Sequence, residues 1–194
     1  TNHGKILPRS IVNAAGPWSP SIGQMVGIDI PVKPRRGHVV VTEAAPKIVH
    51  HKMLEASYTQ TIDATVDDLQ IACVVEDTKS GTILLGSSRE FVGFNPYLRL
   101  DAIQQIVQRA IRFFPVLSKL HAIRAYIGVR PYSPDHKPIL GPCESVPGFY
   151  LATGHEGGGI CLGPITGKLM AQLITGDALD LPLEPYHLKR FDMM

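Results

Sequence analysis

The hydrophobic and polar residues alternate along the chain in two ways, one typical of strands and one typical of a helix. The clearest helical period lies between Asp101 and Phe114, where apolar residues recur on one face. These residues are Ile103, Val107, Ala110, Ile111 and Phe114. Short apolar segments of strand type are found at residues 10–13, 37–42, 69–75, 82–85, 122–130 and 149–153. The pattern predicts a chain that mixes helix and sheet.

Turn and capping residues set the expected ends of these elements. Asp101 and Gln104 have the spacing of a capping box, which predicts that the long helix begins at Asp101. Pro115 should end or kink that helix. A second helix is expected at residues 164–174, with Gly176 as its stop.

The stretch between residues 48 and 94 is rich in β-strand signals. The apolar segments 69–75 and 82–85 flank residues 77–81, whose composition is typical of a turn. We therefore expect an antiparallel hairpin in this part of the chain.

Composition narrows the class of protein. Of 194 residues, 44% are hydrophobic and 19% are charged, the balance of a soluble globular protein. The net charge is +2 and no dense Lys/Arg run is present, so we expect no nucleic-acid partner. The cysteines, Cys73, Cys143 and Cys161, are odd in number and widely spaced, which suits a reducing compartment. With no apolar run of about 18 residues, we expect a cytoplasmic protein, or one associated with a membrane through its partners.

The first residues indicate that the chain is one piece of a longer polypeptide. Thr1 takes the place of a starting methionine, and the apolar segment 10–13 runs directly into Ala14-Ala15-Gly16. This is the expected pattern for entry into the middle of a domain.

A glycine-rich loop between a predicted strand and helix is the strongest candidate for a binding site. Residues 154–159 read Gly-His-Glu-Gly-Gly-Gly. Glycine lets the backbone approach a ligand closely, and a helix N-terminus favours anionic or electron-rich ligand atoms. A tight structural turn would use the same residues. The loop does not match GxGxxG, and that motif is absent from the 194 residues.

Arg130 is the second candidate, because it ends a predicted apolar strand directly before Pro131. Its guanidinium could hold a substrate carboxylate through two parallel hydrogen bonds. The alternative is a structural ion pair or a solvated arginine, which the residue by itself favours. We also assign Tyr126, earlier on the same predicted strand, to substrate binding.

The sequence gives little support for a metal site or for a serine hydrolase. His50 and His51 are adjacent and would face opposite sides of a strand, so we predict no metal site. No serine lies in a GxSxG context, which argues against a nucleophile elbow.

Four segments together resemble a known family. They are residues 11–19, 34–38, 128–141 and 148–167, and their order and spacing match over nearly the whole chain. The sequence resembles the FAD-dependent oxidoreductases of the D-amino-acid oxidase, glycine oxidase and sarcosine oxidase superfamily. Its His-Glu-Gly loop is most similar to the dehydrogenase-type members that act on opines, sarcosine or proline.

The resemblance implies an α+β fold. Residues 34–127 would form an antiparallel substrate-binding sheet with a long helix. Residues 1–33 and 128–194 would be incomplete parts of a Rossmann-like FAD-binding domain. The N-terminal segment that carries GxGxxG in the family is missing from these residues, and we count it as a partner of this chain.

The resemblance also implies roles for individual residues. Arg130 would bind the substrate carboxylate, with FAD as the cofactor. The residues expected to contact FAD are Ala15, Gly16, Gly154, His155, Glu156, Gly157, Gly158, Gly159, Ile160 and Cys161. Glycine-oxidase-like members often have Arg-Asn in this loop, and Gln where this chain has His38. Many of the dehydrogenase-type members that the His-Glu-Gly loop resembles pass electrons to another subunit or carrier instead of oxygen.

The implied reaction is oxidation of the C–N bond of a primary or secondary amino acid, a small-molecule substrate. A hydride leaves the carbon that bears the amine and an imine forms, so the protein's task is positioning and electrostatics. The full-length protein would be the active enzyme, and the fragment alone is expected to be inactive. The alternative is an isolated structural or interaction fragment without its own activity.

Overall fold

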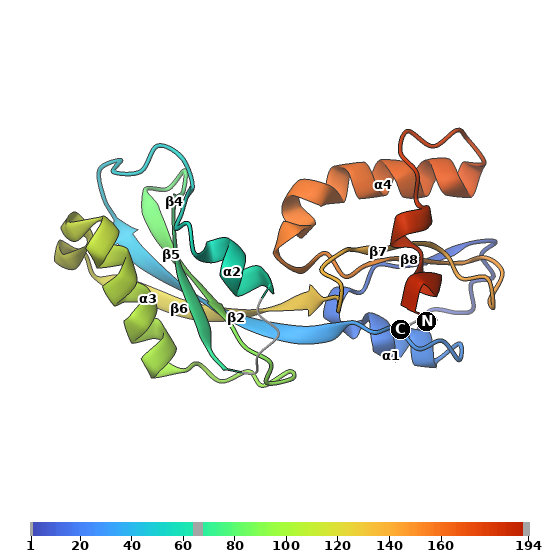
Figure 1. Cartoon of the computed structure of the whole chain (residues 1–194), viewed down its shortest axis with the longest axis horizontal. Coiled ribbons are helices and arrows are strands. Elements are labelled where there is room, and N and C mark those ends of the chain that lie inside the picture. The colour runs from blue at the N-terminus through green and yellow to red at the C-terminus, as the bar shows by residue number, and fades with distance from the viewer. Residues whose placement is uncertain (1, 64–67, 192–194) are drawn as a thin grey trace. The chain divides into compact units, whose positions relative to one another are not determined.

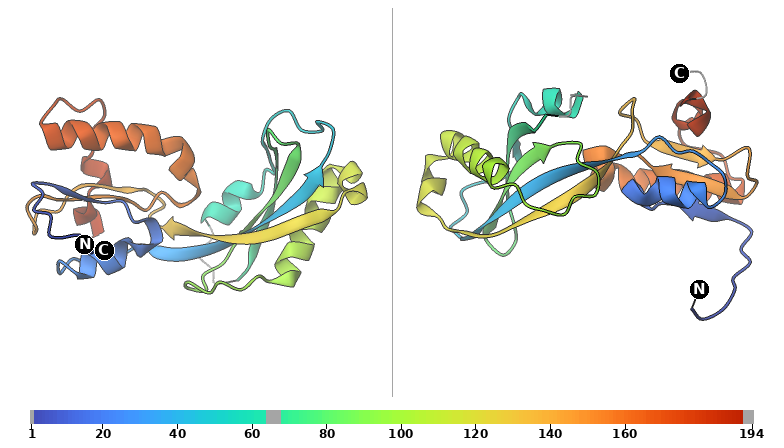
Figure 2. Two further views of the ribbon diagram at one scale, coloured as in Figure 1. Left: turned by 180° about the vertical axis from the view of Figure 1, so that it is seen from behind. Right: turned by 90° about the horizontal axis from the view of Figure 1, so that it is seen from below.

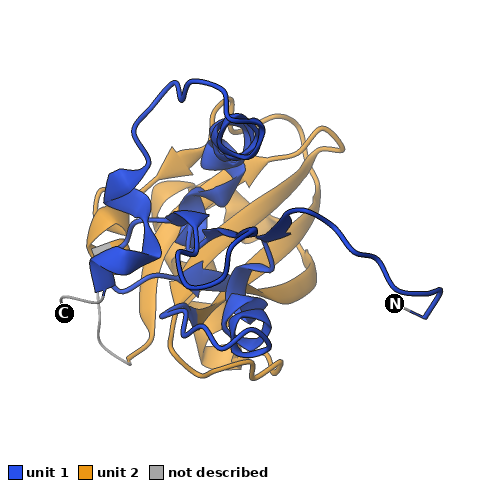
Figure 3. Ribbon diagram, turned by 90° about the vertical axis from the view of Figure 1, so that its right-hand side faces the viewer, with its two compact units in different colours: residues 1–33, 130–194 blue, residues 34–129 orange. Residues whose placement is uncertain are grey.

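A computed structural model describes residues 2–63 and 68–191. The chain divides into two compact units (Figure 3). Unit 1 combines residues 1–33 with residues 130–194, and unit 2 consists of residues 34–129. Each unit is described separately below.

Unit 1 is built on a three-stranded sheet. Its strands are β1 (Ile11–Asn13), β8 (Phe149–Thr153) and β7 (Ile139–Pro142), in the order β1-β8-β7. β1 runs parallel to β8, and β7 runs antiparallel to it. Two segments that are far apart in the sequence thus become neighbours in one sheet.

Helices lie on both faces of the unit 1 sheet, as two opposite views show (Figures 1 and 2). One side carries the 3-10 turn η1 (Gly16–Trp18) and the short helix α1 (Ser19–Gln24). The other side carries α4 (Gly159–Thr175), which follows the 3-10 turn η3 (Glu156–Gly158). Two further 3-10 turns, η4 (Glu184–Tyr186) and η5 (Leu188–Phe191), complete the unit.

The period-two alternation of a strand explains how this sheet fills two cores. Phe149 and Leu151 of β8 pack with Ile30, on the side of α1. Their neighbours Tyr150 and Ala152 pack in the core that contains Leu169 and Met170 of α4. The apolar segment predicted at 149–153 is therefore a strand buried on both faces.

Unit 2 is built on a five-stranded sheet with the order β3-β4-β5-β2-β6. The strands are β2 (Lys33–Ala44), β3 (Met53–Leu54), β4 (Gln70–Asp77), β5 (Thr82–Arg89) and β6 (Ala122–Tyr132). The pairs β3–β4, β4–β5 and β5–β2 are antiparallel, and β4 and β5 form the predicted hairpin. The helices are α2 (Tyr58–Asp63), α3 (Leu100–Phe113) and the 3-10 turn η2 (Pro115–Lys119).

The long helix α3 covers one face of the unit 2 sheet (Figure 1). Ile106 and Ala110 are fully buried against Cys73 and Val75 of β4 and Leu85 of β5. The expected combination of helix and antiparallel sheet, with one long helix, is confirmed.

Two predicted helix starts are wrong. α3 begins at Leu100, and Arg99 is its N-cap residue without a side-chain cap, so Asp101 lies inside the first turn. The Asp101 carboxylate instead accepts hydrogen bonds from the Arg99 guanidinium. α4 begins at Gly159 rather than at Pro164, which lies within the helix. Among residues 2–63 and 68–191, no helix is both long and apolar enough to cross a membrane.

Candidate active site

The parallel pairing of β1 and β8 brings two loops together in unit 1. Asn13, the last residue of β1, is in register with Leu151 of β8. Parallel strands end at the same edge of a sheet, so the segments that follow them start side by side. In open α/β sheets, ligands bind at the carboxyl ends of strands. The edge beyond Asn13 and Thr153 is therefore the natural place for a ligand.

Hydrogen bonds between buried polar side chains fix these two segments. The Asn13 amide nitrogen donates to the Ser19 carbonyl over 3.0 Å, and the Ala15 N–H donates to the Asn13 side-chain oxygen over 3.2 Å. Ser19 Oγ donates to Thr153 Oγ1 over 2.9 Å, and Thr153 Oγ1 donates to the Gly16 carbonyl over 3.0 Å. Asn13, Ser19 and Thr153 are all buried, so these bonds are shielded from water.

Glycine is required at two points of this edge. Gly16 and Gly154 have φ angles of +57° and +78°, a region that side chains disfavour. A Cβ on Gly154 would also lie 3.3 Å from both the Ile139 nitrogen and the Ser133 Cβ. These two glycines turn the chain away from the ends of β1 and β8.

The N-terminus of α4 faces this edge without a side-chain cap. Its N-cap is Gly158, which makes no capping hydrogen bond. The first N–H groups of a helix have no partners within the helix, and the helix dipole adds partial positive charge there. The start of α4 thus offers donors to an electron-rich ligand.

A cavity of about 420 Å³ opens at this edge within unit 1. Seven of the residues predicted for the site line it: Gly16, Arg130, His155, Glu156, Gly157, Gly159 and Ile160. The lining also includes residues that sequence reasoning did not select: Ala14, Pro131, Ala152 and Thr153. The predicted residues Ala15, Gly154 and Gly158, in the same two segments, and Cys161, in the first turn of α4, do not line the cavity. Thr153 could have been found from its place at the end of β8, directly before the glycine loop.

Two charged side chains of opposite sign line the cavity. Arg130 Nε lies 3.9 Å from Glu156 Oε1, and the two side chains are 20% and 8% exposed. The Glu156 carboxylate also accepts a hydrogen bond from the Gly157 N–H. The sequence left open whether Arg130 makes an ion pair or binds a ligand, and the structure shows it close to a carboxylate inside a cavity.

His155 enters the cavity wall as a neutral side chain. Its Nε2 atom lies 3.0 Å from Thr166 Oγ1 on α4. Burial lowers the pKa of His155, because removal from water disfavours the charged ring. The ring therefore adds no positive charge at neutral pH.

Tyr126 belongs to unit 2. It lies on β6 and is 40% exposed, and the Arg124 guanidinium lies 5.7 Å from the centre of its ring. Its assignment to substrate binding stays a prediction.

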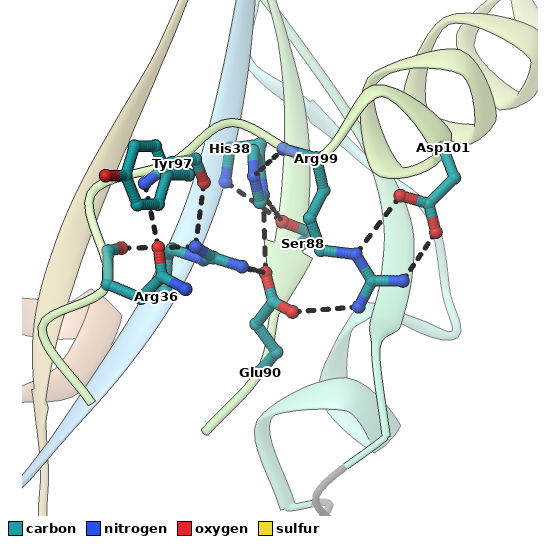
Figure 4. Close-up of polar contacts among 8 residues, drawn as sticks. Arg36, His38, Ser88, Glu90, Tyr97, Arg99 and Asp101 are labelled. Atoms are coloured by element: carbon teal, nitrogen blue, oxygen red, sulfur yellow. Dashed lines mark hydrogen bonds and ion pairs between the residues drawn. The ribbon is translucent and has the colours of Figure 1, made fainter. Parts of the chain in front are cut away.

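A second polar cluster lies in unit 2, around the buried carboxylate of Glu90 (Figure 4). Arg36 donates from Nε to Glu90 Oε1 over 2.9 Å, and Arg99 donates from Nη1 to Glu90 Oε2 over 3.0 Å. Arg36 Nη1 also donates to the carbonyls of Asn95 (3.1 Å) and Tyr97 (2.7 Å). These bonds fasten the segment before α3 to β2.

His38 completes this cluster from the adjacent part of β2. The Arg99 N–H donates to His38 Nε2 over 3.1 Å, so Nδ1 carries the proton and faces Ser88 Oγ at 2.8 Å (Figure 4). Burial is the largest effect on the pKa of His38 and lowers it; Arg36 and Arg99 lower it further, and Glu90 and Asp101 raise it. The hydrogen bonds in this cluster support a structural role. Among the described residues, no group of three or more His, Cys, Asp or Glu could hold a metal ion.

The residues of the unit 1 cavity suit a flavin. Gly16 and Gly159 contribute backbone without side-chain bulk, and a Cβ at Gly16 would meet no atom within 4 Å. The uncapped N–H groups at the start of α4 suit the electron-rich oxygen of a flavin ring. The site is thus that of an α+β protein with a ligand cavity between strand ends and a helix N-terminus.

Comparison with known families identifies the class. The family model "FAD dependent oxidoreductase" matches residues 1–173. The chain belongs to this family of flavoproteins, whose cofactor is FAD.

Individual relatives agree with the family assignment. The chain is 36% identical to the hydrogen cyanide synthase subunit HcnC of Pseudomonas protegens, over 94% of this chain and 40% of that protein. It is 27% identical to glycine oxidase of Pseudomonas aeruginosa, over 96% of this chain and 47% of the relative. The crystal structure of glycine oxidase from Geobacillus kaustophilus matches with a TM-score of 0.82 at 24% identity, over 93% of this chain and 45% of that chain. This likeness shows the fold. The chain spans less than half the length of these relatives.

Proposed function

We propose that this chain is the C-terminal part of an FAD-dependent oxidoreductase that oxidises the C–N bond of a small primary or secondary amino acid. One observation carries the proposal: Arg130, the glycine loop and the start of α4 line the same cavity. A cationic side chain and a set of backbone donors therefore meet where an amino acid and a flavin would have to meet.

Arg130 would hold the substrate by its carboxylate. The planar guanidinium can donate two parallel hydrogen bonds to a carboxylate, which fixes the orientation as well as the distance. Pro131 follows directly and restricts the local backbone, which limits the directions that the arginine can take. A fixed carboxylate holds the α-carbon of the substrate in one place, the main requirement for a reaction that depends on positioning.

Backbone groups would hold the flavin. The N–H groups of the first turn of α4 and of residues 157–159 would face the ring, and the bend at Ala15 and Gly16 would approach it from the end of β1. When bound, FAD supplies the chemistry as the acceptor of the hydride from the α-carbon. Neutral His155, held by Thr166, would keep the cavity wall rigid without adding charge.

The relatives suggest the size of the substrate and the presence of partners. One relative is named a glycine oxidase and another a subunit of hydrogen cyanide synthase. We propose a small amino acid as the substrate, other subunits or an electron carrier as partners, and the N-terminal FAD-binding segment as the missing part of the site. Residues 34–127 would form the substrate-binding domain, and Tyr126 would contribute to substrate binding.

The test uses the full-length polypeptide, loaded with FAD and kept free of oxygen. Addition of glycine, sarcosine or proline should bleach the flavin absorbance for at least one of them, with the matching imine or its hydrolysis product in the solution. A flavoprotein whose spectrum no amino acid or amine reduces would overturn the proposal. The alternative, a fragment with a structural or interaction role only, would then be the better account.

A further inference from the structure

The side chain of His155 connects the wall of the unit 1 cavity to helix α4. His155 lines the cavity, and a Cβ at Gly159, the first residue of α4, would lie 3.5 Å from the Cβ of His155. The Nε2 atom of the ring lies 3.0 Å from Oγ1 of Thr166 on the same helix. Thr166 is buried and does not itself line the cavity. One nitrogen of a cavity residue is therefore held by a buried hydroxyl of the helix.

The hydroxyl of Thr166 determines which ring nitrogen carries the proton. A threonine in a helix often donates to the carbonyl four residues earlier, as Thr175 does to Ala171 over 3.0 Å. Thr166 does not make the corresponding bond to Leu162, and among residues 2–63 and 68–191 the contact with His155 is the one hydrogen bond of its side chain. A buried O–H requires an acceptor, because an unpaired one is costly. Nε2 is that acceptor, so it carries no proton.

The neutral ring of His155 then carries its proton on Nδ1. Burial lowers the pKa of His155 and so favours the neutral ring, which has one donor and one acceptor nitrogen. Nδ1 makes no hydrogen bond within the part of the chain that the structure describes, and it is not one of the sealed atoms that lack a partner. It is therefore reached from outside the core, and the cavity is the space that His155 lines. An N–H donor is thus available to a ligand there.

We propose that Thr166 is a positioning residue, which holds His155 in the tautomer whose Nδ1–H donates a hydrogen bond to the electron-rich edge of the flavin ring. The uncapped N–H groups at the start of α4 lie beside His155, so Nδ1–H would add a side-chain donor to these backbone donors. The inference rests on the proposed function, which places the flavin ring in this cavity. It assigns a role toward the cofactor to a residue that does not line the cavity.

Two variants remove the Nδ1–H donor in different ways. Thr166→Val keeps the shape of the side chain but lacks the hydroxyl, so Nε2 is free to take the proton and Nδ1 becomes an acceptor. In His155→Gln, the amide can reach Thr166, but no donor remains where Nδ1 was. A donor at this edge favours the form of the ring with more negative charge, which is the reduced form. The equilibrium constant for two-electron reduction of FAD should therefore fall about tenfold in each variant, or about 30 mV in potential.

The potential would be measured on the FAD-loaded full-length protein against a reference dye, at about pH 8, where the ring of His155 is neutral. Thr166→Ser keeps the hydroxyl and should restore the wild-type potential. Thr175→Val, at an exposed position of the same helix, is the matched control and should leave the potential unchanged. If the bond between Thr166 and His155 serves only the fold, Thr166→Val will unfold in less urea while its flavin keeps the wild-type potential, and the inference is wrong.

The tautomer itself can be observed by nitrogen NMR. The full-length protein would be labelled with ¹⁵N in its histidines, and the signals of His155 identified by their loss in His155→Gln. Nδ1 should be the protonated nitrogen in the wild type and in Thr166→Ser. A wild-type signal with the proton on Nε2 would overturn the inference whatever the potentials are.

Ile160→Ala separates a failure of this inference from a failure of the proposed function. Ile160 lines the cavity and is 93% exposed, so its loss should shift the flavin absorbance if the ring lies there. Such a shift, together with wild-type potentials in Thr166→Val and His155→Gln, would contradict the role of Thr166 alone. Unchanged flavin spectra and potentials in all three variants would contradict the place of the flavin in this cavity, and with it both proposals.

Discussion

Ser19 Oγ donates a hydrogen bond to Thr153 Oγ1 over 2.9 Å, and this bond joins residues 134 positions apart in the chain. Thr153 Oγ1 in turn donates a hydrogen bond to the Gly16 carbonyl. The two hydroxyls thus connect the bend after β1 to the end of β8, directly beneath the candidate cavity. Both side chains are buried, so neither partner can turn to water instead.

Thr153→Val should therefore destabilise the protein. Valine keeps the shape but leaves the Gly16 carbonyl without this donor and the Ser19 hydroxyl without this acceptor. Leaving buried polar groups unpaired costs about 1–3 kcal/mol in the free energy of unfolding. Urea unfolding followed by circular dichroism would measure this. Thr175→Val, at an exposed position of α4, is the control: its hydroxyl bonds to Ala171, Gln172 and Asp177 lie at the surface, where water replaces lost partners, so the free energy should change by less than about 0.5 kcal/mol. Equal stability of the two variants would contradict the role assigned to Thr153.

Arg130→Lys should impair the full-length enzyme even though the charge is kept. An ammonium group cannot reproduce the planar fork, so we expect kcat/KM for the amino-acid substrate to fall by about tenfold or more. Flavin content, read from the absorbance ratio, should stay near the wild-type value. Arg112→Lys, at an exposed position of α3, is the matched control. Near-normal kcat/KM in Arg130→Lys and Arg130→Ala would show that the carboxylate binds elsewhere.

The chain of 194 residues by itself should bind FAD weakly or not at all. Its cavity can contact the flavin ring, but GxGxxG, which holds the pyrophosphate in dinucleotide-binding folds, is absent from its sequence. Gel filtration of the chain mixed with FAD would test this, with the full-length polypeptide run in parallel. One equivalent of FAD that stays with the short chain through the column would refute the expectation.

His38 should make the stability of unit 2 depend on pH. Its folded-state pKa lies below the ordinary value of 6.5, mainly because of burial, so the unfolded chain takes up the proton first. The stabilisation is complete above about pH 6.5 and declines as the pH falls from 6.5 toward the folded-state pKa. Protonation of Nε2 would also break the hydrogen bond from the Arg99 N–H.

The variant His38→Gln isolates this effect, because the glutamine amide can accept from Arg99 and donate toward Ser88 without titrating near neutral pH. Urea unfolding of both proteins between pH 5 and 8 should show a smaller loss of stability on the acid side in the variant. His155 shifts in the same direction and remains in both proteins, so it cancels in the comparison. Parallel curves for the two proteins would show that His38 does not titrate as described.

The period of the apolar residues was enough to place the main elements. Short apolar runs bounded by turn residues located β4, β5, β6 and β8, and in β4 four consecutive residues, 72–75, are buried. The helical period located α3, since its buried residues recur on one face. Residue types also indicated the glycine loop and Arg130. Glycine allows the backbone to approach a ligand closely, and a guanidinium can hold a carboxylate. All of these features depend on residues that are close together in the sequence.

The starts of the two long helices were decided by contacts between distant residues. Arg99, the N-cap of α3, is held by Glu90, nine positions earlier, and by His38, 61 positions earlier on β2. α4 begins within the glycine run, where local preference disfavours a helix, while Leu169 and Met170 anchor the rest of it in the core.

In the candidate site too, local sequence determines some features and contacts between distant residues determine the others. The sequence supplied the donors, the arginine and the glutamate, but it gave no distance between Arg130 and Glu156 and no sign that Thr153 would bond to Ser19 and Gly16. Those relationships depend on the parallel pairing of β1 with β8, which joins segments separated by more than a hundred residues. Local sequence determines which conformation a segment prefers; only the closure of the chain on itself determines which side chains meet, because that choice is made by the packing of the whole unit.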